Sequence, residues 1–497
     1  MKFRSGPWLA YPIVMTVAMI VATKPLRAQT GCGQGAGQDI TVTNLAQNET
    51  VGYELLLIKG NLGATADGIH LDQGPVLSGS QSAPPEASDG SGAPKAVRDW
   101  PAGGGRFKAL VHLKRGQNRI MLSAEGHKTF CLDVNYSPNP SANRIRVVFV
   151  LAQDGSEGAG VIPGPPGDIS DLPSAKKRLA FGALLLETAM AELLHDAGRS
   201  RRTVNFKRDS RGLVEVTVFH SAYKDVDLRT KTPDQLWETF HDELDSAFQD
   251  GRTIFLSMLG GFGGGALGGG SQAMFGTSTL YSWAQDLGEL TNRFSDERKP
   301  GDFQLEDESG FRNAFWANYS TGIGATMHEL GHALGLPHSG DGNDIMERGF
   351  DRFNRIFMIK EEGALITDEA VRYSPSSADR LFQSPWVLPS APAGVVAKAR
   401  RNADLTLGRI GNRITLSASA SGPVTVDLFA PDGVRAARLF MGTLAAGEHG
   451  FTLPRLTPGL YFCAVKRETA ADGATGKSTK GADASGTQSA LVRIVIP

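Results

Sequence analysis

The sequence predicts a multidomain protein in which an α/β (α+β) domain built on a mixed sheet is flanked by two β-sandwich domains. Three observations support this. The chain has 497 residues, a length typical of about three domains rather than one core. Strand-type runs dominate both ends of the chain, whereas strands alternate with helices in the middle. A stretch of prolines and small residues at 384–396 separates the middle from the C-terminal part.

The first residues have the pattern of a secretory signal peptide. Lys2 and Arg4 precede an apolar stretch from Trp8 to Ala22, and Ala28 offers a small residue for cleavage. This stretch is shorter than the roughly 20 apolar residues that a membrane span needs. We therefore expect residues 1–28 to be a signal peptide. The mature protein would be secreted, extracellular or periplasmic, with no stable membrane span.

The net charge and the cysteines limit which partners and which kinds of metal site the protein is expected to have. The formal net charge of −1 gives no electrostatic reason to expect binding to nucleic acid or to an anionic membrane. The chain has three cysteines, Cys32, Cys131 and Cys463. In an exported protein two of them could pair, Cys32 with Cys131 being favoured, and one would be left over. No Cys-x-x-Cys occurs, which excludes a cysteine zinc site.

Residues 29–138 are predicted to form the N-terminal β-sandwich domain. A Gly/Ser/Pro/Ala-rich stretch at 77–97 is predicted to be a surface loop or disordered. Residues 114–118 form a turn between two strand-type runs. The strand-type runs of this region are Ile40–Thr43, Tyr53–Ile58, Phe107–Leu113, Arg119–Ser123 and Phe130–Val134.

Residues 139–392 are predicted to form the α/β domain. A β-branched run at Arg144–Ala152 suits a buried strand, and the Gly/Pro-rich Gly155–Pro173 cannot be helical. Ser174–Ala197 follows as a helix that is apolar nearly all round, as expected of a helix packed against a sheet. The remaining predicted elements are strand Val214–Phe219, helix Pro233–Phe248, strands Thr253–Met258 and Thr279–Trp283, and helix Thr321–Leu334.

Residues 393–497 are predicted to form the C-terminal β-sandwich. Turn residues such as Pro431-Asp432-Gly433 separate its strands, and 466–489 is poor in apolar residues and predicted to be a hairpin loop. The predicted strands are Ile414–Ala418, Val424–Ala430, Gly450–Leu453, Gly459–Val465 and Ala490–Ile496.

Residues 328–338 carry the most specific motif, His-Glu-Leu-Gly-His-Ala-Leu-Gly-Leu-Pro-His. On an α-helix, His328 and His332 differ by roughly 40° and share one face. Both imidazoles can then reach one Zn²⁺ at about 2.0–2.1 Å. Gly335 accepts positive φ and lets the chain leave the helix, so that a turn brings His338 round as the third ligand. The sequence therefore predicts one catalytic Zn²⁺ as cofactor.

The residue beside the first ligand predicts hydrolysis. Three histidine ligands leave an open fourth position, which is typical of catalytic rather than structural zinc. Zinc in such a site lowers the pKa of a bound water towards about 7. Glu329 can face that water without ligating the metal, and we predict that it is the catalytic general base. The expected substrate is a protein or peptide.

The spacing of the motif matches the metzincin pattern, which a downstream methionine turn completes. Met346, eight residues after His338, is the candidate Met-turn residue and would form an apolar floor under the histidines. Ser339 follows His338, as in matrixins. Three departures argue against that subfamily: no Cys-Gly propeptide switch, no calcium or structural-zinc segment, and Glu347-Arg348-Gly349 where matrixins have a Tyr-Pro turn.

Several segments resemble a metallopeptidase family that is known chiefly from fungi and also occurs in bacteria. The resemblance covers roughly residues 39–385 and implies zinc and a metzincin-like fold but no particular substrate. Residues 424–497 instead resemble the immunoglobulin-like modules that end many exported bacterial enzymes. The segments that carry the family resemblance are Phe107–Leu113 with Gly116–Asn118 in the N-terminal β region, then Gly268–Ser271, Phe275–Gly276, Leu280–Trp283, His328–His338, Ile345–Met346, Arg348–Phe350 and Asn354–Arg355.

The substrate-binding surface is predicted around two segments. Gly260–Gly270 lacks the Gly-Lys-Ser/Thr of a nucleotide loop and is either a flexible rim above the cleft or a plain connection. The run that follows is predicted to be the edge strand that pairs an extended substrate. Aromatic residues after the Met turn are candidates for the S1′ pocket. The candidate substrate-binding residues are Thr279, Leu280, Tyr281, Phe350 and Phe353.

The leading hypothesis is an exported zinc endopeptidase. One alternative is a zinc hydrolase that acts on a non-protein amide or ester, because the same metal chemistry would serve it. Another is a binding or adhesive β-protein with a vestigial metal centre. An intact Glu329 argues against the last, since a binding module has no use for a general base.

Overall fold

The computed structural model describes residues 39–389 with short gaps, and strands of the C-terminal part. Cys32 and Gly37 are also described, whereas the predicted signal peptide and the predicted loop at 77–97 lie outside the described residues. None of the described helices is both long enough and apolar enough to cross a membrane. The gaps are 64–65, 74–98, 140, 142, 159, 249–250, 264 and 369, and the C-terminal ranges are 405–410, 413–418, 421–429, 435–452, 459–468 and 487–496.

Eight strands of the N-terminal region follow one another in a single hydrogen-bonded order, β1-β3-β6-β5-β4-β7-β8-β2. Every described pair is antiparallel except β2 with β8. Along β7, alternate residues such as Ile120 and Leu122 are buried, which is the period expected of a strand with one covered face. The predicted strands of this region are confirmed. Their bounds are β1 Thr41–Val42, β2 Glu49–Val51, β3 Leu55–Asn61, β4 Gly68–Gln73, β5 Asp99–Gly103, β6 Arg106–His112, β7 Gly116–Ser123 and β8 Phe130–Tyr136.

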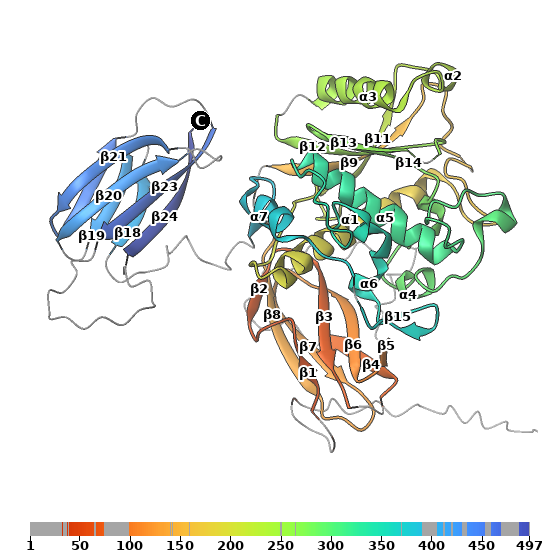
Figure 1. Ribbon diagram of the computed structural model, residues 1–497, viewed down its shortest axis with the longest axis horizontal. Coiled ribbons are helices and arrows are strands. Elements are labelled where there is room, and N and C mark those ends of the chain that lie inside the picture. The colour runs from red at the N-terminus through yellow and green to blue at the C-terminus, as the bar shows by residue number, and fades with distance from the viewer. Residues whose placement is uncertain are drawn as a thin grey trace, which may run out of the picture.

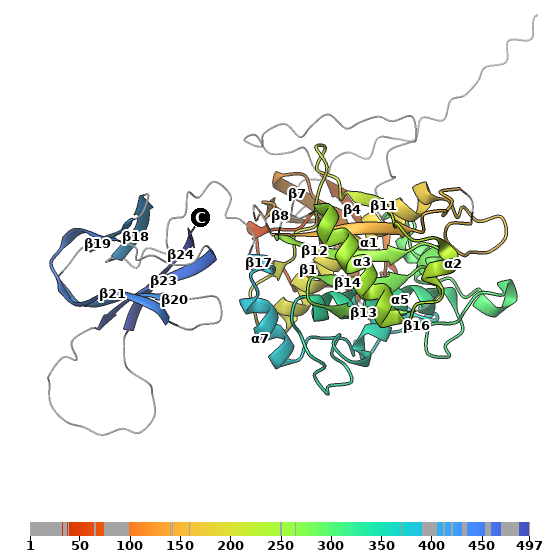
Figure 2. The same cartoon turned by 90° about the horizontal axis from the view of Figure 1, so that it is seen from above.

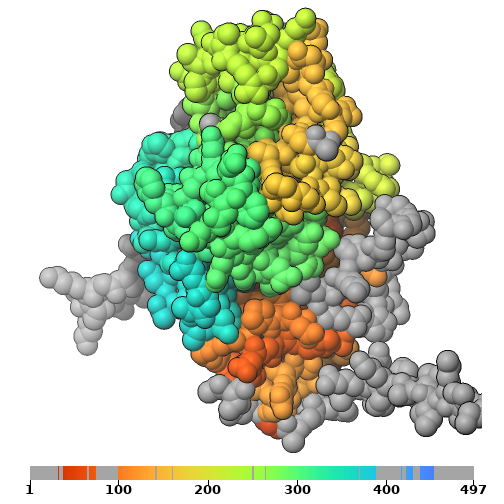
Figure 3. Space-filling model, turned by 90° about the vertical axis from the view of Figure 1, so that its right-hand side faces the viewer, coloured from red at the N-terminus to blue at the C-terminus, as the bar shows by residue number. Residues whose placement is uncertain are grey.

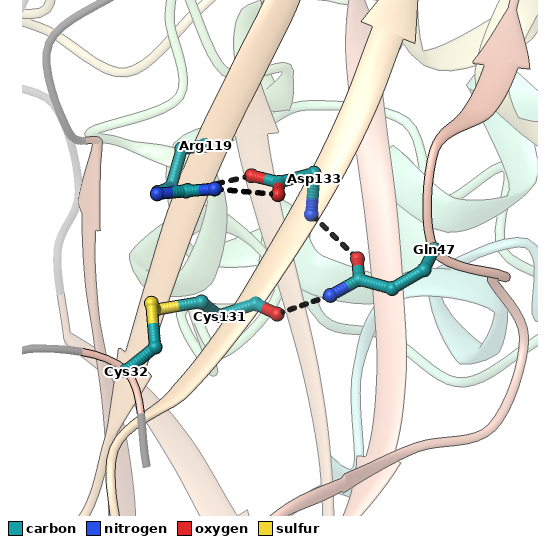
Figure 4. The surroundings of a disulfide bond; sticks show 5 residues. All are labelled: Cys32, Gln47, Arg119, Cys131 and Asp133. Carbon is teal, nitrogen blue, oxygen red and sulfur yellow. Dashed lines mark hydrogen bonds and ion pairs between the residues drawn. A yellow bond between two sulfur atoms is a disulfide. The ribbon is translucent and has the colours of Figure 1, made fainter. Parts of the chain in front are cut away.

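A disulfide joins Cys32 to Cys131 on β8, the pairing that the sequence favours. Beside it, Gln47 bridges to the same strand: its Nε2 donates to the Cys131 carbonyl at 2.8 Å, and its Oε1 accepts from the Asp133 amide at 2.7 Å (Figure 4). Arg119 forms two 2.8 Å hydrogen bonds to the Asp133 carboxylate. The cross-link connects residues 99 apart and restricts the unfolded chain accordingly.

The central region is built on a mixed five-stranded sheet with the order β11-β9-β12-β14-β13. Four strands are parallel and β13, at one edge, is antiparallel to β14. Helix α3 covers one face of the sheet, and helices α1 and α5 lie on the other (Figures 1 and 2). The bounds are β9 Arg144–Leu151, β11 Val216–His220, β12 Thr253–Leu259, β13 Ala266–Gly269, β14 Gln272–Gly276, α1 Leu172–Asp196, α3 Pro233–Phe248 and α5 Phe315–Ala333.

The sequence of β9 explains why helices cover both faces of the sheet. Val148 and Val150 pack with α3, which turns Phe240 and Leu244 towards them. The alternate residues of the strand, such as Phe149, point to the other face and join the core around α1. A continuous apolar run is expected of a strand that is buried on both sides.

Helix α1 lies between the central sheet and the N-terminal strands. Asp171 caps it by accepting a hydrogen bond from the Ser174 amide at 2.9 Å, and Pro173 occupies its first turn. The apolar residues of α1 belong to one core cluster that includes both the central sheet and the N-terminal strands. In the space-filling view the N-terminal region directly abuts the central one (Figure 3). The core is therefore continuous across residues 138 and 139. The domain boundary between these two residues stays a prediction.

The predicted strand at Thr279–Trp283 is wrong. Residues Leu280–Ser282 form a 3-10 turn, η1, in which the Ser282 hydroxyl donates to the Thr279 carbonyl at 2.6 Å. The turn is buried because Trp283 packs into the core against Gly182 of α1. The glycine-rich stretch supplies the sheet edge instead, as the β13–β14 hairpin.

Short elements connect and complete the central region. Strand β10 pairs with β17, and β15 pairs with β16. The segment after α5 returns along that helix as η3 and α6. The remaining bounds are β10 Arg202–Thr203, α2 Asp225–Leu228, α4 Leu290–Arg293, η2 Pro300–Phe303, η3 Arg348–Arg352, α6 Asn354–Phe357, β15 Lys360–Glu361, β16 Ala364–Leu365, α7 Pro375–Gln383 and β17 Leu388–Pro389.

The described C-terminal strands form two antiparallel sheets, with the orders β18-β19-β22 and β21-β20-β23-β24. All five predicted strands of this part are confirmed, whereas β18 and β21 were missed. Part of the predicted loop at 466–489 belongs to strands, and 469–486 lies outside the described residues. The bounds are β18 Leu405–Ile410, β19 Arg413–Ala418, β20 Gly422–Phe429, β21 Arg435–Leu444, β22 Gly447–Thr452, β23 Gly459–Glu468 and β24 Thr487–Ile496.

Candidate metal centre

The three histidines of the motif converge on one point. His328 and His332 lie one turn apart on α5, and Gly335 adopts a φ of +87° just after the helix, so that the chain turns back and brings in His338. The three Nε2 atoms are separated by 3.0, 3.2 and 3.3 Å. Three nitrogens that each lie about 2.0–2.1 Å from one ion in tetrahedral directions would be about 3.3 Å apart, close to these distances.

Backbone carbonyls fix which nitrogen of two rings faces the centre. The Nδ1 atom of His328 lies 2.7 Å from the Ile345 carbonyl, and that of His332 lies 2.7 Å from the Leu336 carbonyl. Since a carbonyl only accepts, each Nδ1 carries the proton and each Nε2 keeps its lone pair. Lone pairs this close repel each other unless a cation lies between them. The residues present therefore fit a metal ion.

The three histidines differ in their exposure to solvent. His328 is buried, His332 is half-buried and His338 is exposed. Burial lowers the pKa of His328 to about 4, so this ring is neutral at physiological pH, as a metal ligand must be. The described ligands thus leave the centre open towards solvent on the His338 side.

Glu329 stands out among the buried carboxylates. It is 9% exposed, and no group in the described part of the chain forms a hydrogen bond with its carboxylate. Burial raises the pKa of Glu329 to about 7. A carboxyl group with a pKa near neutrality can both accept and release a proton at physiological pH, which is the property expected of a general base or acid.

The predicted Met turn lies against the helix that carries the ligands. Met346 is fully buried, and a Cβ added to Gly331 would lie 2.3 Å from its sulfur, so the glycine beside His332 is what allows this close approach. The preceding residue, Ile345, supplies the carbonyl that orients His328. The turn therefore supports the centre both by packing and by hydrogen bonding.

Asp344 organises this turn and was not singled out from the sequence. Its side chain is fully buried and accepts hydrogen bonds from the Met346 amide at 2.9 Å, the Ser374 amide at 3.0 Å and the Ser377 hydroxyl at 2.7 Å. The only sequence indication is an aspartate two residues before the amide that it binds, which is the spacing of an Asx turn. Its partners near Ser374 are too distant in sequence to be predicted.

The two phenylalanines predicted for the S1′ pocket have different surroundings. Phe350, in η3, is half-buried, and its ring lies edge-on to that of His328 with centroids 5.2 Å apart. Phe353 is fully buried and packs against Phe357, and its contact with a substrate stays a prediction. Its apolar character is needed for the core between η3 and α6.

The three residues predicted to contact a substrate along an edge strand lie in or beside a 3-10 turn, and their contact with a substrate stays a prediction. Thr279, Leu280 and Tyr281 are all buried in or beside η1, where the Tyr281 hydroxyl accepts a hydrogen bond from Asn318 at 3.0 Å. The true sheet edge, β13, approaches the metal-site helix at Gly268. A Cβ at that position would lie 2.3 Å from the Glu329 carbonyl oxygen, so only glycine fits.

The His-Glu-x-x-His helix, the third histidine and their convergence form the ligand arrangement that is typical of zinc metallopeptidase sites. The chain belongs to the Metallopep family, described as "Putative peptidase family", whose profile matches residues 39–381. The predicted family resemblance is confirmed for this part of the chain.

Two yeast proteins are similar in sequence. A Schizosaccharomyces pombe protein named "Putative zinc metalloproteinase" is 25% identical over 350 residues, which are 65% of this chain and 54% of that protein. A Saccharomyces cerevisiae protein with the same description is 36% identical over 110 residues, 21% of this chain and 16% of that protein. The chain thus spans about half the length of the first relative and less of the second.

Among solved structures, OgpA from Akkermansia muciniphila is similar, with 14% sequence identity and a TM-score of 0.33, over 72% of this chain and 94% of that one. A catalytically inactive form in complex with an O-glycopeptide substrate gives a TM-score of 0.34. A likeness at this level supports no argument about the substrate of the present chain.

Proposed function

We propose that the chain is an exported zinc endopeptidase with a metzincin-like catalytic region. The observation that supports this most strongly is the convergence of the three Nε2 atoms on one point, with Glu329 following the first ligand on the same helix. A structural zinc site would be closed by a fourth protein ligand, and none joins the three histidines among the described residues.

Each residue of the site has a role in this proposal. His328, His332 and His338 hold the metal, which when bound activates water and polarises the scissile carbonyl. Glu329 accepts the proton of the attacking water and passes it to the leaving amine, a task that suits a carboxyl whose pKa is raised to about 7. Met346 and Asp344 keep the turn that orients His328 in place.

The peptide substrate would lie extended along β13. Among the described strands it pairs with β14 alone, so its other edge would have backbone groups available to a further strand. At Gly268 the strand lies against the backbone of Glu329, which places the added strand close to the metal centre. Phe350, which packs edge-on against His328, is suited to form an apolar wall of the S1′ pocket.

We also propose the following organisation and location. Residues 1–28 are a signal peptide, 29–138 an N-terminal β-sandwich domain, 139–392 the catalytic domain and 393–497 an immunoglobulin-like module. The Cys32–Cys131 disulfide supports export to an oxidising compartment, because such bonds persist chiefly outside the cytosol. The two antiparallel C-terminal sheets support a sandwich.

The test is cleavage of a diverse peptide library by the full chain, with products identified by mass spectrometry. Cleavage should require bound metal, stop on chelation, return on addition of zinc, and be lost in Glu329→Gln. Cleavage that survives either the chelator or the substitution would disprove the mechanism.

Two other outcomes would favour the alternatives. Zinc-loaded, folded protein that cleaves no peptide but hydrolyses small amides or esters would indicate a non-peptide hydrolase. Zinc-loaded protein that is inactive on both kinds of substrate would indicate a binding protein with a vestigial centre.

A further inference from the structure

Phe311 has an unusual position for an aromatic residue. Its side chain is 98% exposed, the highest exposure among the large apolar residues in the described chain. Its backbone adopts a φ of +72°, a region that residues other than glycine, asparagine and aspartate rarely occupy. Folding thus leaves a large apolar side chain in water on a strained backbone, an arrangement more often kept for function than for stability.

The loop that carries Phe311 is held in place from both sides. Before it, the Ser309 amide donates to Asp307 at 3.0 Å. After it, the Asn313 amide donates to the other oxygen of Asp307 at 3.2 Å. Arg312 donates to the Ser309 carbonyl at 2.8 Å and to the Thr321 hydroxyl of α5 at 2.5 Å. Phe311 is therefore displayed on a fixed loop.

The loop lies near the metal centre. Thr321, its anchor on α5, precedes His328 by seven residues, which places it on the same face of the helix and about 10 Å away along the axis. On the other side, a Cβ at Gly310 would lie 3.4 Å from the Arg348 guanidinium. Arg348 in turn lies over the Phe350 ring, 4.8 Å from its centroid, and Phe350 packs against His328.

We propose that Phe311 is a specificity-determining residue that contacts an apolar side chain of the peptide, a few residues from the cleaved bond. The inference rests on the proposed peptidase function and extends it to one subsite. Covering Phe311 with an apolar partner removes from water the surface that the free protein exposes, so binding gains the corresponding hydrophobic free energy.

The main test compares wild-type protein with Phe311→Ala on the peptide library. The wild type should show an apolar preference at one position a few residues from the cleaved bond, and the variant should lose it. For the best peptide we expect KM to rise about tenfold with kcat nearly unchanged, because the contact is made equally in the ground and transition states. An unchanged cleavage profile and KM would overturn the proposal.

A structural role for Phe311 is tested by stability. Phe311→Gly should raise the thermal midpoint, since glycine accepts positive φ without strain, and should lose the subsite preference as the alanine variant does. Leu213→Ala is the matched control, because Leu213 is an exposed leucine (51%) in a different loop, and the variant should retain the wild-type profile. A fall in the midpoint of Phe311→Ala would indicate a structural role and contradict the proposal.

A binding experiment separates this proposal from the peptidase function. Zinc-loaded Glu329→Gln protein, with and without Phe311→Ala, is titrated with fluorescent peptides that carry an apolar residue at each position in turn. Weaker binding of the double variant supports the Phe311 contact even if the wild type cleaves nothing, a result that would refute the proposed function alone. Equal affinities would refute the Phe311 contact, whether or not the wild type cleaves peptides.

Discussion

Helices α1 and α5 each carry a glutamate with low solvent exposure, but the two carboxylates differ in their hydrogen-bond partners. Glu192 of α1 is fully buried and is hydrogen-bonded by Tyr53 at 2.7 Å, Asn44 at 2.9 Å and Arg201 at 2.8 Å. Glu329 of α5 is 9% exposed and has no hydrogen-bond partner among the described residues. The paired carboxylate fastens the N-terminal strands to α1, whereas the unpaired one remains available to exchange a proton.

The pKa directions of these two glutamates express the same difference. Burial raises the pKa of both. At Glu192, Arg201 and the hydrogen-bond donors outweigh burial, and the pKa is lowered from 4.5. At Glu329 burial acts alone, and the pKa rises to about 7. For these two glutamates, the direction of the pKa shift follows from the presence or absence of partners.

The largest effect is expected at Glu329. Glu329→Gln keeps size and shape but removes the proton acceptor, so kcat should fall by roughly 10²–10⁴-fold, the usual contribution of general acid–base catalysis. Zinc content, measured by mass spectrometry of the metal, should be unchanged because Glu329 is not a ligand. A variant that retained wild-type kcat would show that the unpaired carboxylate has no catalytic role.

The opposite pattern is expected at Glu192. Glu192→Gln leaves the buried Arg201 without its principal counter-charge and should lower the free energy of unfolding by about 3 kcal/mol, as breaking a buried ion pair does. Denaturant titration measures the loss. Below the unfolding transition, kcat should stay near wild type. A large loss of kcat in the folded variant would contradict the division between the two helices.

A pair of neighbouring glycines tests the approach of the edge strand to α5. Gly268→Ala would place a methyl group against the Glu329 carbonyl and displace β13, so kcat/KM should fall by about tenfold or more. Gly269→Ala meets nothing within 4 Å and should stay close to wild type. Peptide cleavage kinetics provide the measurement, and equal activities would show that β13 does not position the substrate.

The smallest effect concerns pH. The pKa of Glu192 is lower in the folded protein than in the unfolded chain, where it is near 4.5. The ionised carboxylate therefore stabilises the folded protein fully above pH 4.5. This stabilisation is lost as the pH falls through the pKa of the folded state. Glu192→Gln should therefore flatten the acid side of the plot of unfolding free energy against pH. If the unfolding free energies of wild type and variant fell in parallel at acid pH, Arg201 would not be what keeps this carboxylate ionised.

The sequence predicts those features that are determined by residues close together in the chain. The three ligands follow from helical spacing and one glycine turn, and α3 follows from its apolar period. The glycine-rich edge strand was missed because its strand character comes from pairing with β14 rather than from propensity. The run at 279–283 looked like a strand, but burial of Trp283 against α1 turned it into η1. The role of Asp344 depends on contacts with Ser374 and Ser377, about 30 residues away, which no local pattern reveals.

The most direct measurement is anomalous X-ray scattering at the zinc absorption edge from crystals of the zinc-saturated protein. We predict one strong peak about 2.0–2.1 Å from the Nε2 atoms of His328, His332 and His338, with the Glu329 carboxylate nearby but not bound to the metal. A peak at another place, or no peak at the three histidines, would contradict the assignment of this site.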